Sequence, residues 1–414
     1  MTATQADDAG TPPRRRLVLA GLLTATTCAL VAEGVVNVNL MPYAQGLGVP
    51  AAALGFVFVV HRLTRLAVAP WVGLLADRVG RRPPLLLGLA CAGLGLVALA
   101  LAQGTIALVA ARVLWGLASA LIVTAGFASA LDIAGPTERG GILGLYQAAL
   151  YGVYPFGTVV GGFLVDGLGY VRTFALCAGV VLASAALASL TVRETRRRDR
   201  LAGTADAAAG LADYARLLRG PIRRYVTLKM LSGFAIWGVF EATFVLFLLD
   251  TLGPATTLLG TGLGTTSVAG VLLALMLVLG FLVGSPAVGR WSDRSGRHMR
   301  AVVGSLGLTV LGLAALGAAA TAEGMALAVV ALGLAVALIS SPLTALVGAA
   351  APPDARAAVM AAYAALSDVA SAAGAILGAA AALSAGYRLT YLATAALVAV
   401  GTAALVVPRT RRHL

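Results

Sequence analysis

A strongly apolar stretch, FVFVVHRLTRLAVAPWVGLL (56–75), carries three basic side chains near its middle: His61, Arg62 and Arg65. Because an α-helix rotates by about 100° per residue, the three side chains fall on one face. Arginine offers a permanent charge and paired donors to an anion, whereas histidine can also gain or lose a proton near neutral pH. This face therefore predicts anion binding, proton handling or ion pairing.

Four more charged residues lie inside apolar stretches: Glu33, Arg112, Glu241 and Asp368. A rise of about 1.5 Å per residue places Glu33, His61, Arg62 and Glu241 at nearly one depth. Glu33 is the leading candidate for proton coupling, because its surroundings can tune the proton affinity of a buried carboxyl. Asn37 lies one turn away as a polar neighbour, and Glu241 is expected at the equivalent place in the second half.

Static roles for these residues stay open. Arg62 can pair permanently with Glu33, Arg65 can be a structural ion-pair partner, and His61 can be a packed neutral histidine. Asp368 can likewise pair with an arginine. The question is whether Arg62 and Arg65 bind a substrate anion or only hold Glu33, and the second alternative is slightly favoured.

Composition determines what kind of protein surrounds these charges. Of 414 residues, 60% are hydrophobic and 11% are charged, whereas soluble domains are about a quarter charged. The chain is therefore an integral membrane protein, for which charges in hydrocarbon are costly and face a protein interior or a wet cavity. Cys28, Cys91 and Cys177 each lie in apolar runs without CxxC spacing, so neither a disulfide framework, a metal site nor a cofactor is expected.

Twelve runs are long enough to cross a bilayer, which needs about 20 helical residues. They are expected at 17–42, 51–75, 85–102, 106–131, 142–165, 171–191, 225–250, 263–288, 300–319, 325–350, 357–384 and 389–407. The predicted fold is thus an all-α membrane protein with 12 transmembrane helices in two six-helix pseudo-symmetric bundles.

Basic residues predict the orientation. With a cytoplasmic N-terminus, 25 of the 30 Lys and Arg residues fall in inner segments, as the positive-inside rule requires. The net charge of +13 therefore reports topology, and nucleic-acid binding is not needed to explain it. We expect a multi-pass protein of the cell (inner or plasma) membrane with both termini cytoplasmic.

The domain organisation follows from these spans. We expect a cytoplasmic tail (1–16), an N-terminal bundle (17–191), a cytoplasmic linker (192–224), a C-terminal bundle (225–407) and a second tail (408–414). The linker is predicted to contain a short surface helix around 211–219.

The two halves repeat each other. GLLADRVGR (73–81) aligns with GRWSDRSGR (289–297), and a shift that is larger by one position aligns Gly116 with Gly333. An even number of spans separates the copies, so they have the same orientation. Parallel repeats of this kind are an architecture of secondary transporters.

The doubled loop resembles the signature loop of the major facilitator superfamily. Its residues are Gly73, Asp77, Arg78, Gly80 and Arg81, repeated as Gly289, Asp293, Arg294, Gly296 and Arg297. Arg112 to Gly116 resembles the superfamily's RxxxG motif, and the turns at 136–139 and 353–356 match its 4–5 and 10–11 loops. The resemblance implies that the doubled loops form the cytoplasmic gate. There each aspartate is expected to accept from backbone donors at a helix N-terminus and to pair with an arginine from a neighbouring helix.

The fifth span is only partly similar to the GPxxGG pattern of the superfamily's proton-antiporter branch. Its glycines are Gly157, Gly161 and Gly162, but the proline stands ahead of them as Pro155. Gly157 and Gly161 permit close helix packing, and Pro155 can kink the span. Packing alone explains these residues at least as well as antiport does.

The resemblance implies a secondary active transporter that works by alternating access. We expect proton-coupled export of small organic molecules or drugs, with the lipid bilayer, the substrate and protons as partners and a monomeric state. The alternative is proton-coupled uptake or exchange of an anionic metabolite on the cluster of His61, Arg62, Arg65 and Arg112. An enzyme is disfavoured, because the sequence has no Walker loop, HExxH, GxSxG or Cys/His cluster.

Overall fold

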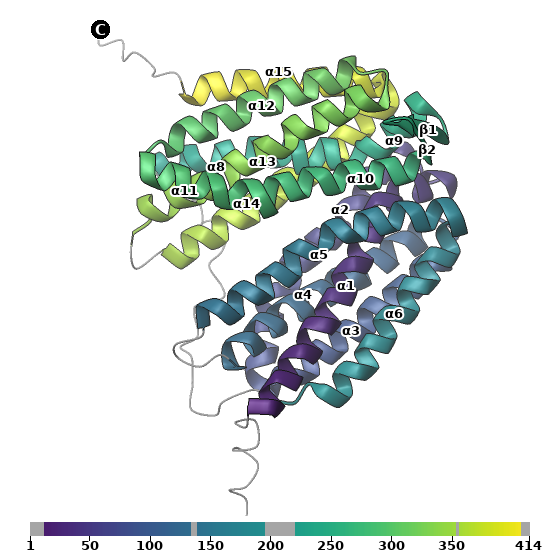
Figure 1. Ribbon diagram of the computed structural model, residues 1–414, viewed down its shortest axis with the longest axis vertical. Coiled ribbons are helices and arrows are strands. Elements are labelled where there is room, and N and C mark those ends of the chain that lie inside the picture. Colours follow the sequence, from purple (N-terminus) through teal and green to yellow (C-terminus); the bar gives the residue numbers. More distant parts are fainter. Residues whose placement is uncertain (1–11, 134–138, 195–219, 353–355, 407–414) are drawn as a thin grey trace, which may run out of the picture. The chain divides into compact units, whose positions relative to one another are not determined.

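The computed structural model describes residues 12–133, 139–194, 220–352 and 356–406 (Figure 1). In these ranges twelve helical stretches are long and apolar enough to cross a membrane. Helices dominate because a bilayer interior offers no partner to backbone N–H and C=O groups, so each span must satisfy its own. The predicted all-α class with twelve spans is confirmed, and the described residues add only a short two-stranded hairpin.

The first six spans are single helices. They are α1 (Pro12–Gly46), α2 (Ala51–Val79), α3 (Arg82–Ala100), α4 (Thr105–Ile133), α5 (Arg139–Leu168) and α6 (Tyr170–Thr191).

The last six spans include two helices with π-helical segments. The elements are α8 (Gly220–Ser232), η1 (Gly233–Phe240), α9 (Glu241–Leu252), β1 (Ala255–Leu258), β2 (Thr261–Gly264), α10 (Thr265–Leu277), η2 (Val278–Gly284), α11 (Ser285–Ser295), α12 (His298–Ala318), α13 (Ala322–Ala350), α14 (Arg356–Ala385) and α15 (Tyr387–Val406). One span runs from α8 through η1 and α9, and the next runs from α10 through η2 and α11.

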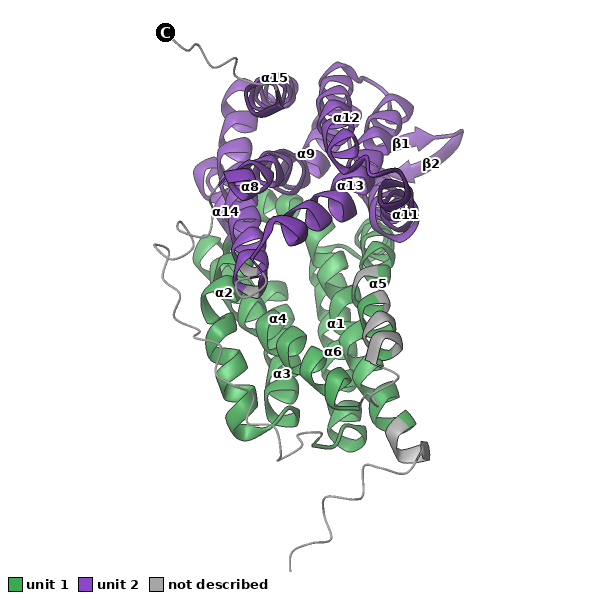
Figure 2. Cartoon of the chain, turned by 90° about the vertical axis from the view of Figure 1, so that its left-hand side faces the viewer, with its two compact units in different colours: residues 1–48, 60–207 green, residues 49–59, 208–414 purple. Residues whose placement is uncertain are grey.

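The chain forms two compact units (Figure 2). Unit 1 comprises residues 1–48 and 60–207, and unit 2 comprises residues 49–59 and 208–414. The first turns of α2 thus group with unit 2, although the rest of that helix belongs to unit 1.

Glycines bring α1 and α5 into close contact in unit 1. A Cβ on Gly34 would lie 2.6 Å from the carbonyl oxygen of Tyr154, and one on Gly161 would lie 2.7 Å from the Cα of Val35. Both distances are shorter than van der Waals contact, so the crossing requires glycine. α5 is continuous through Pro155.

The same crossing recurs in unit 2 between η1 and α14. A Cβ on Gly238 would lie 2.6 Å from the carbonyl oxygen of Ser371, and one on Gly378 would lie 3.0 Å from the Cα of Val239. Gly238 of η1 therefore corresponds to Gly34 of α1.

A second crossing also recurs. In unit 1, a Cβ on Gly116 of α4 would lie 2.5 Å from the carbonyl oxygen of His61 in α2. In unit 2, one on Gly333 of α13 would lie 3.1 Å from the carbonyl oxygen of Met276 in α10. Met276 is thus the counterpart of His61.

The segment η2 accounts for a change of register between the two copies. The interval from Met276 to Gly289 is longer by one residue than the corresponding interval from His61 to Gly73. η2 lies in the longer interval, and a π-helical segment accommodates one extra residue without ending the helix.

Three expectations differ from the structure or lie outside it. The seventh span begins at Gly220 rather than 225, with Pro221 in its first turn, where the missing proline N–H costs nothing. The eighth begins at Thr265 because the hairpin occupies the residues before it. The expected surface helix at 211–219 and the turns at 136–138 and 353–355 lie outside the described residues.

Candidate functional site

Three charged or titratable side chains from three helices meet inside unit 1. His61 Nε2 of α2 lies 3.7 Å from Glu33 Oε1 of α1. On the other side of the ring, His61 Nδ1 lies 2.5 Å from Nη2 of Arg112 in α4. Only 1% of Arg112 is exposed, and His61 is also buried. Glu33, His61 and Arg112 are hereafter the Glu–His–Arg cluster.

The RxxxG motif explains how α4 reaches the imidazole. Gly116 lies one turn beyond Arg112, where it lets α4 approach the backbone of α2 at His61. A larger residue at Gly116 would separate the two helices and move the guanidinium away from the ring. The glycine and the arginine of this motif therefore act together to place one donor on His61.

This geometry determines which ring nitrogen holds the proton. A guanidinium only donates hydrogen bonds and stays protonated, so Nδ1 of His61 must accept with its lone pair. The neutral ring then carries its proton on Nε2, which faces the carboxylate of Glu33. A second proton on Nδ1 would remove the acceptor, so a doubly protonated His61 and the Arg112 hydrogen bond exclude each other.

Three other sequence-predicted residues of unit 1 are Asn37, Arg62 and Arg65. Asn37 donates from Nδ2 to the hydroxyl of Tyr154 in α5, over 2.5 Å. Arg62 and Arg65 are half-buried on α2. The carboxylate of Glu33 approaches His61, the first of the three basic residues on this helix.

Unit 2 repeats the scaffold of the cluster without its charges. Trp237 precedes Gly238 as Glu33 precedes Gly34, Met276 is the counterpart of His61, and Val329 precedes Gly333 by one turn as Arg112 precedes Gly116. Met276 and Val329 are fully buried, and the Trp237 ring stacks on Phe281 with centroids 5.7 Å apart. The helix crossings therefore form with apolar side chains, and the charges of the cluster are not needed to pack them.

The expected equivalence of Glu33 and Glu241 is wrong. The crossing of η1 with α14 aligns Gly238 with Gly34, and this puts Glu241 at the position of Asn37. Glu241 is buried at the start of α9. The intervals that suggested the equivalence, from Glu33 to Gly48 and from Glu241 to Gly253, differ by three residues.

Asp368 of unit 2 interacts electrostatically with Lys229. Lys229 lies in α8, inside the seventh span. Pairing of Asp368 with an arginine stays a prediction.

Carboxylates from α2, α4 and the segment after α6 hold the first copy of the doubled loop, which lies in unit 1. Arg81 donates to Asp77 over 2.9 Å and to Asp132 of α4 over 3.1 Å. Glu194, after α6, accepts from the backbone N–H groups of Arg81 and Arg82 at the start of α3. The expected role of Asp77 at a helix N-terminus is therefore filled by Glu194, and Arg81 of the loop itself is the partner of Asp77.

Gly80 permits this arrangement. Its φ of 101° is accessible mainly to glycine, and a Cβ there would collide with the Glu194 carboxylate. In unit 2, Gly296 has a φ of 65° at the corresponding turn, and Asp293 lies 3.9 Å from His298. Sequence reasoning missed Asp132 and Glu194. The signal available was their position at the ends of spans that otherwise contain few acidic residues.

Within the described residues, no group of three or more His, Cys, Asp or Glu side chains is arranged to hold a metal ion.

Comparison with known proteins places this geometry in a family. The family model of the Major Facilitator Superfamily matches residues 22–280 and 242–414. Multidrug resistance protein 1 of Bacillus subtilis (strain 168) is 27% identical over 184 residues, which cover 44% of this chain and 47% of that protein. Probable vesicular acetylcholine transporter-B of Danio rerio is 35% identical over 152 residues, covering 36% and 30%. The chain thus spans less than half the length of these curated relatives.

Solved structures match over nearly the whole chain. A bacterial homolog of the human lysosomal transporter Spinster, in an inward-facing conformation, has a TM-score of 0.77 at 16% identity and covers 96% of this chain and 97% of its own. The nucleoside transporter NupG has a TM-score of 0.76 at 13% identity, covering 94% and 98%. With its twelve spans, its doubled loop and the family match over most of its length, the chain belongs to the Major Facilitator Superfamily, a family of membrane transporters rather than enzymes.

Proposed function

We propose that the protein is a proton-coupled exporter of small organic molecules that works by alternating access. We place it as a monomer in the cell membrane with both termini cytoplasmic. The observation that carries the proposal is the Glu–His–Arg cluster, in which a carboxylate, a titratable ring and a permanent cation are connected across three helices.

The cluster offers two places for one proton. A proton on the Glu33 carboxylate removes the negative charge that faces the Nε2–H of His61. A second proton on His61 can bind only at Nδ1, and it requires Arg112 to leave the ring, because that nitrogen no longer accepts. Protonation and the α2–α4 contact are therefore coupled through a single nitrogen atom, which is how a proton can favour one conformation over another.

The apolar counterpart in unit 2 supports a functional role. Trp237, Met276 and Val329 occupy the same positions on the same crossings. Charges are costly inside a membrane, and unit 2 shows that the scaffold can be built without them. Retention of three such groups in unit 1 is therefore best explained by proton handling.

Relatives favour export over uptake. Two partial matches are multidrug resistance proteins of Bacillus subtilis. Engagement of Arg112 with His61 also leaves one arginine fewer to bind an anionic substrate. Two bundles, near 17–191 and, with the observed start of the seventh span, near 220–407, remain part of the proposal, with transport carried out by both together.

The test uses proteoliposomes with an imposed pH gradient and ethidium as an aromatic cationic probe. Wild-type protein should move ethidium against a flux of protons. Glu33→Gln should abolish the proton flux, because the amide cannot accept a proton at this site. Glu323→Gln, which makes the same chemical change at an exposed position of α13, is the matched control and should behave as wild type.

Full coupling in Glu33→Gln would refute the assignment of that residue. Gradient-driven uptake of an organic anion, lost on Arg62→Ala or Arg65→Ala with the fold intact, would instead favour the uptake or exchange of an anionic metabolite.

A further inference from the structure

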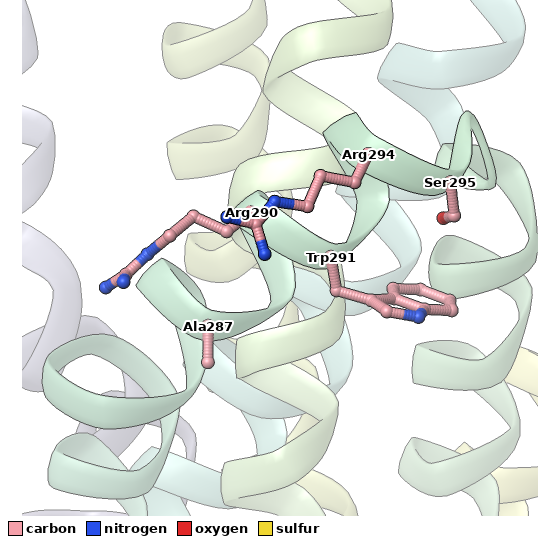
Figure 3. Close-up of a pocket in the computed structure, with 5 residues that line it drawn as sticks. All are labelled: Ala287, Arg290, Trp291, Arg294 and Ser295. Carbon is pink, nitrogen blue, oxygen red and sulfur yellow. The ribbon is translucent and has the colours of Figure 1, made fainter.

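A cavity of about 430 Å³ lies on the surface of unit 2, on an element that takes no part in the Glu–His–Arg cluster (Figure 3). Its lining comes entirely from α11: Ala287, Arg290, Trp291, Arg294 and Ser295. In Figure 3 the two arginine side chains extend to the same side, and the Trp291 ring lies on the other side. These five residues are hereafter the α11 face.

The spacing of the α11 face is that of one helical stripe. Its members follow each other at i, i+3, i+4, i+7 and i+8, which is the pattern of a single face. The opposite face packs inward, since a Cβ on Gly289 would lie 2.7 Å from Ser341 Oγ of α13 and Ser292 is fully buried. Trp291 is 46% exposed. Trp291, Arg290 and Arg294 therefore lie on the exposed face of α11, opposite its packed face.

This region carries an excess of positive charge. Between 290 and 300 the chain has four arginines but only one carboxylate, Asp293, which lies near His298. The corresponding loop of unit 1 differs, because Arg81 there binds both Asp77 and Asp132. The α11 face thus has a charge that an external anion can complement.

The internal repeat indicates that Arg290 and Trp291 of the α11 face are additions to the scaffold, whereas Arg294 repeats Arg78. In the alignment of Gly289 with Gly73, the residues Arg290, Trp291 and Ser295 stand where unit 1 has Leu74, Leu75 and Val79. Unit 1 forms the same loop without them. Packing of the repeat therefore does not explain an exposed tryptophan between two arginines.

Exposed apolar residues continue the stripe in the direction of the membrane. Leu282 is exposed, and so is Val283, one turn before Ala287. From Val283 to Arg290 the chain advances about seven residues, roughly 10 Å along a helix. Apolar, aromatic and basic side chains thus follow one another in the order of acyl chain, membrane interface and headgroup phosphate.

We propose that the α11 face binds the headgroup of an anionic phospholipid. Arg290 and Arg294 donate to the phosphate, the Trp291 ring lies at the level of the headgroups, and the acyl chains lie along Leu282 and Val283. The positive-inside rule predicts that this end of the bundle is cytoplasmic, and the cytoplasmic leaflet is the one that carries anionic lipids. This proposal is independent of proton coupling.

The test compares lipids on the purified full-length protein in a neutral detergent. Phosphatidylglycerol and phosphatidylcholine with identical acyl chains are titrated separately, bound lipid is counted by native mass spectrometry, and the unfolding temperature is recorded. Wild type should bind phosphatidylglycerol preferentially. Arg290→Leu should weaken that binding about five-fold, the contribution of one basic side chain at a membrane surface.

Two further variants keep the test decisive. Arg290→Leu combined with Trp291→Leu restores the residues of unit 1 and should remove the preference for phosphatidylglycerol while the protein stays folded in neutral detergent. Should that pair reduce folding, Arg290→Gln tests the charge alone. Arg223→Leu removes an exposed arginine of α8 and should leave the preference unchanged.

Two results would overturn the proposal. One is an equal preference for phosphatidylglycerol in wild type and Arg290→Leu. The other is complete displacement of the lipid by millimolar inorganic phosphate, with the same gain in unfolding temperature, which would make the face a site for free phosphate.

Discussion

The contact between His61 and Arg112 can be measured with the residues that unit 2 uses in their place. The variants are His61→Met, Arg112→Val and the combination of both, which reproduces Met276 and Val329 of the apolar crossing. Each single variant leaves one buried polar partner without the other. The double variant removes both.

The structure gives the magnitude. Nη2 of Arg112 lies 2.5 Å from Nδ1 of His61, and both side chains are buried. A hydrogen bond that involves a charged group contributes about 1.5–3 kcal/mol, and a buried partner left alone also loses its solvation. The cavity left by Arg112→Val occurs in both the single and the double variant, so it cancels in a double-mutant cycle. We expect the losses of unfolding free energy in the two single variants to add up to about 2 kcal/mol more than the loss in the double variant.

The assay is the free energy of unfolding of the purified protein in mixed micelles with increasing denaturing detergent, for wild type and all three variants. Proton-coupled transport is measured in parallel and should be lost in all three, because each removes part of the cluster. Additive losses of stability would show that the contact contributes nothing, and transport in the double variant would refute its role in coupling.

Three further outcomes follow from single contacts. Gly34→Ala should destabilise unit 1 by about 1–3 kcal/mol, because the new Cβ would lie 2.6 Å from a backbone oxygen of α5. The control Gly179→Ala, with open space around it, should be neutral or up to about 1 kcal/mol stabilising. Thermal unfolding of the two variants is compared, and equal effects would contradict the close crossing. Arg81→Gln should lower the unfolding free energy by about 1–3 kcal/mol through loss of its two carboxylate partners, and should slow transport while the ethidium-induced shift in unfolding temperature stays unchanged. Tyr43→Phe removes a 3.0 Å hydrogen bond to a carbonyl at the end of α3 and should cost about 0.5–1.5 kcal/mol, measured in the same denaturant series; no loss would mean that the carbonyl finds another donor.

The spans, their number and the family were predictable from the sequence. A bilayer requires about 20 consecutive apolar residues for each crossing, so the signal is local and does not depend on packing. The repeat was visible for a similar reason, since the turns of GLLADRVGR and GRWSDRSGR need glycine at the same places. Depth along each helix also follows from a constant rise, which is why Glu33 and His61 were expected at one level.

Local pattern did not reveal the register within unit 2. η1 and η2 have ordinary apolar sequences, and an added residue in a π-helical segment leaves composition unchanged. The alignment of Glu241 with Asn37 required the tertiary structure, in which Gly34 and Gly238 make matching backbone contacts at the two helix crossings. The partners of Arg81 were not predicted either, because Asp132 and Glu194 are distant from it in sequence.

The sequence by itself determined that basic and acidic side chains lie at one depth inside a membrane protein of two repeated halves. Only the tertiary structure decided that Glu33 faces His61 and that Arg112 takes the other nitrogen of the same ring. Neighbouring residues on a helix differ by about 100° in direction, so the choice of partner depends on how each helix is rotated and how closely it approaches the next. Gly116 sets that approach, and its effect exists only once α2 and α4 have packed together.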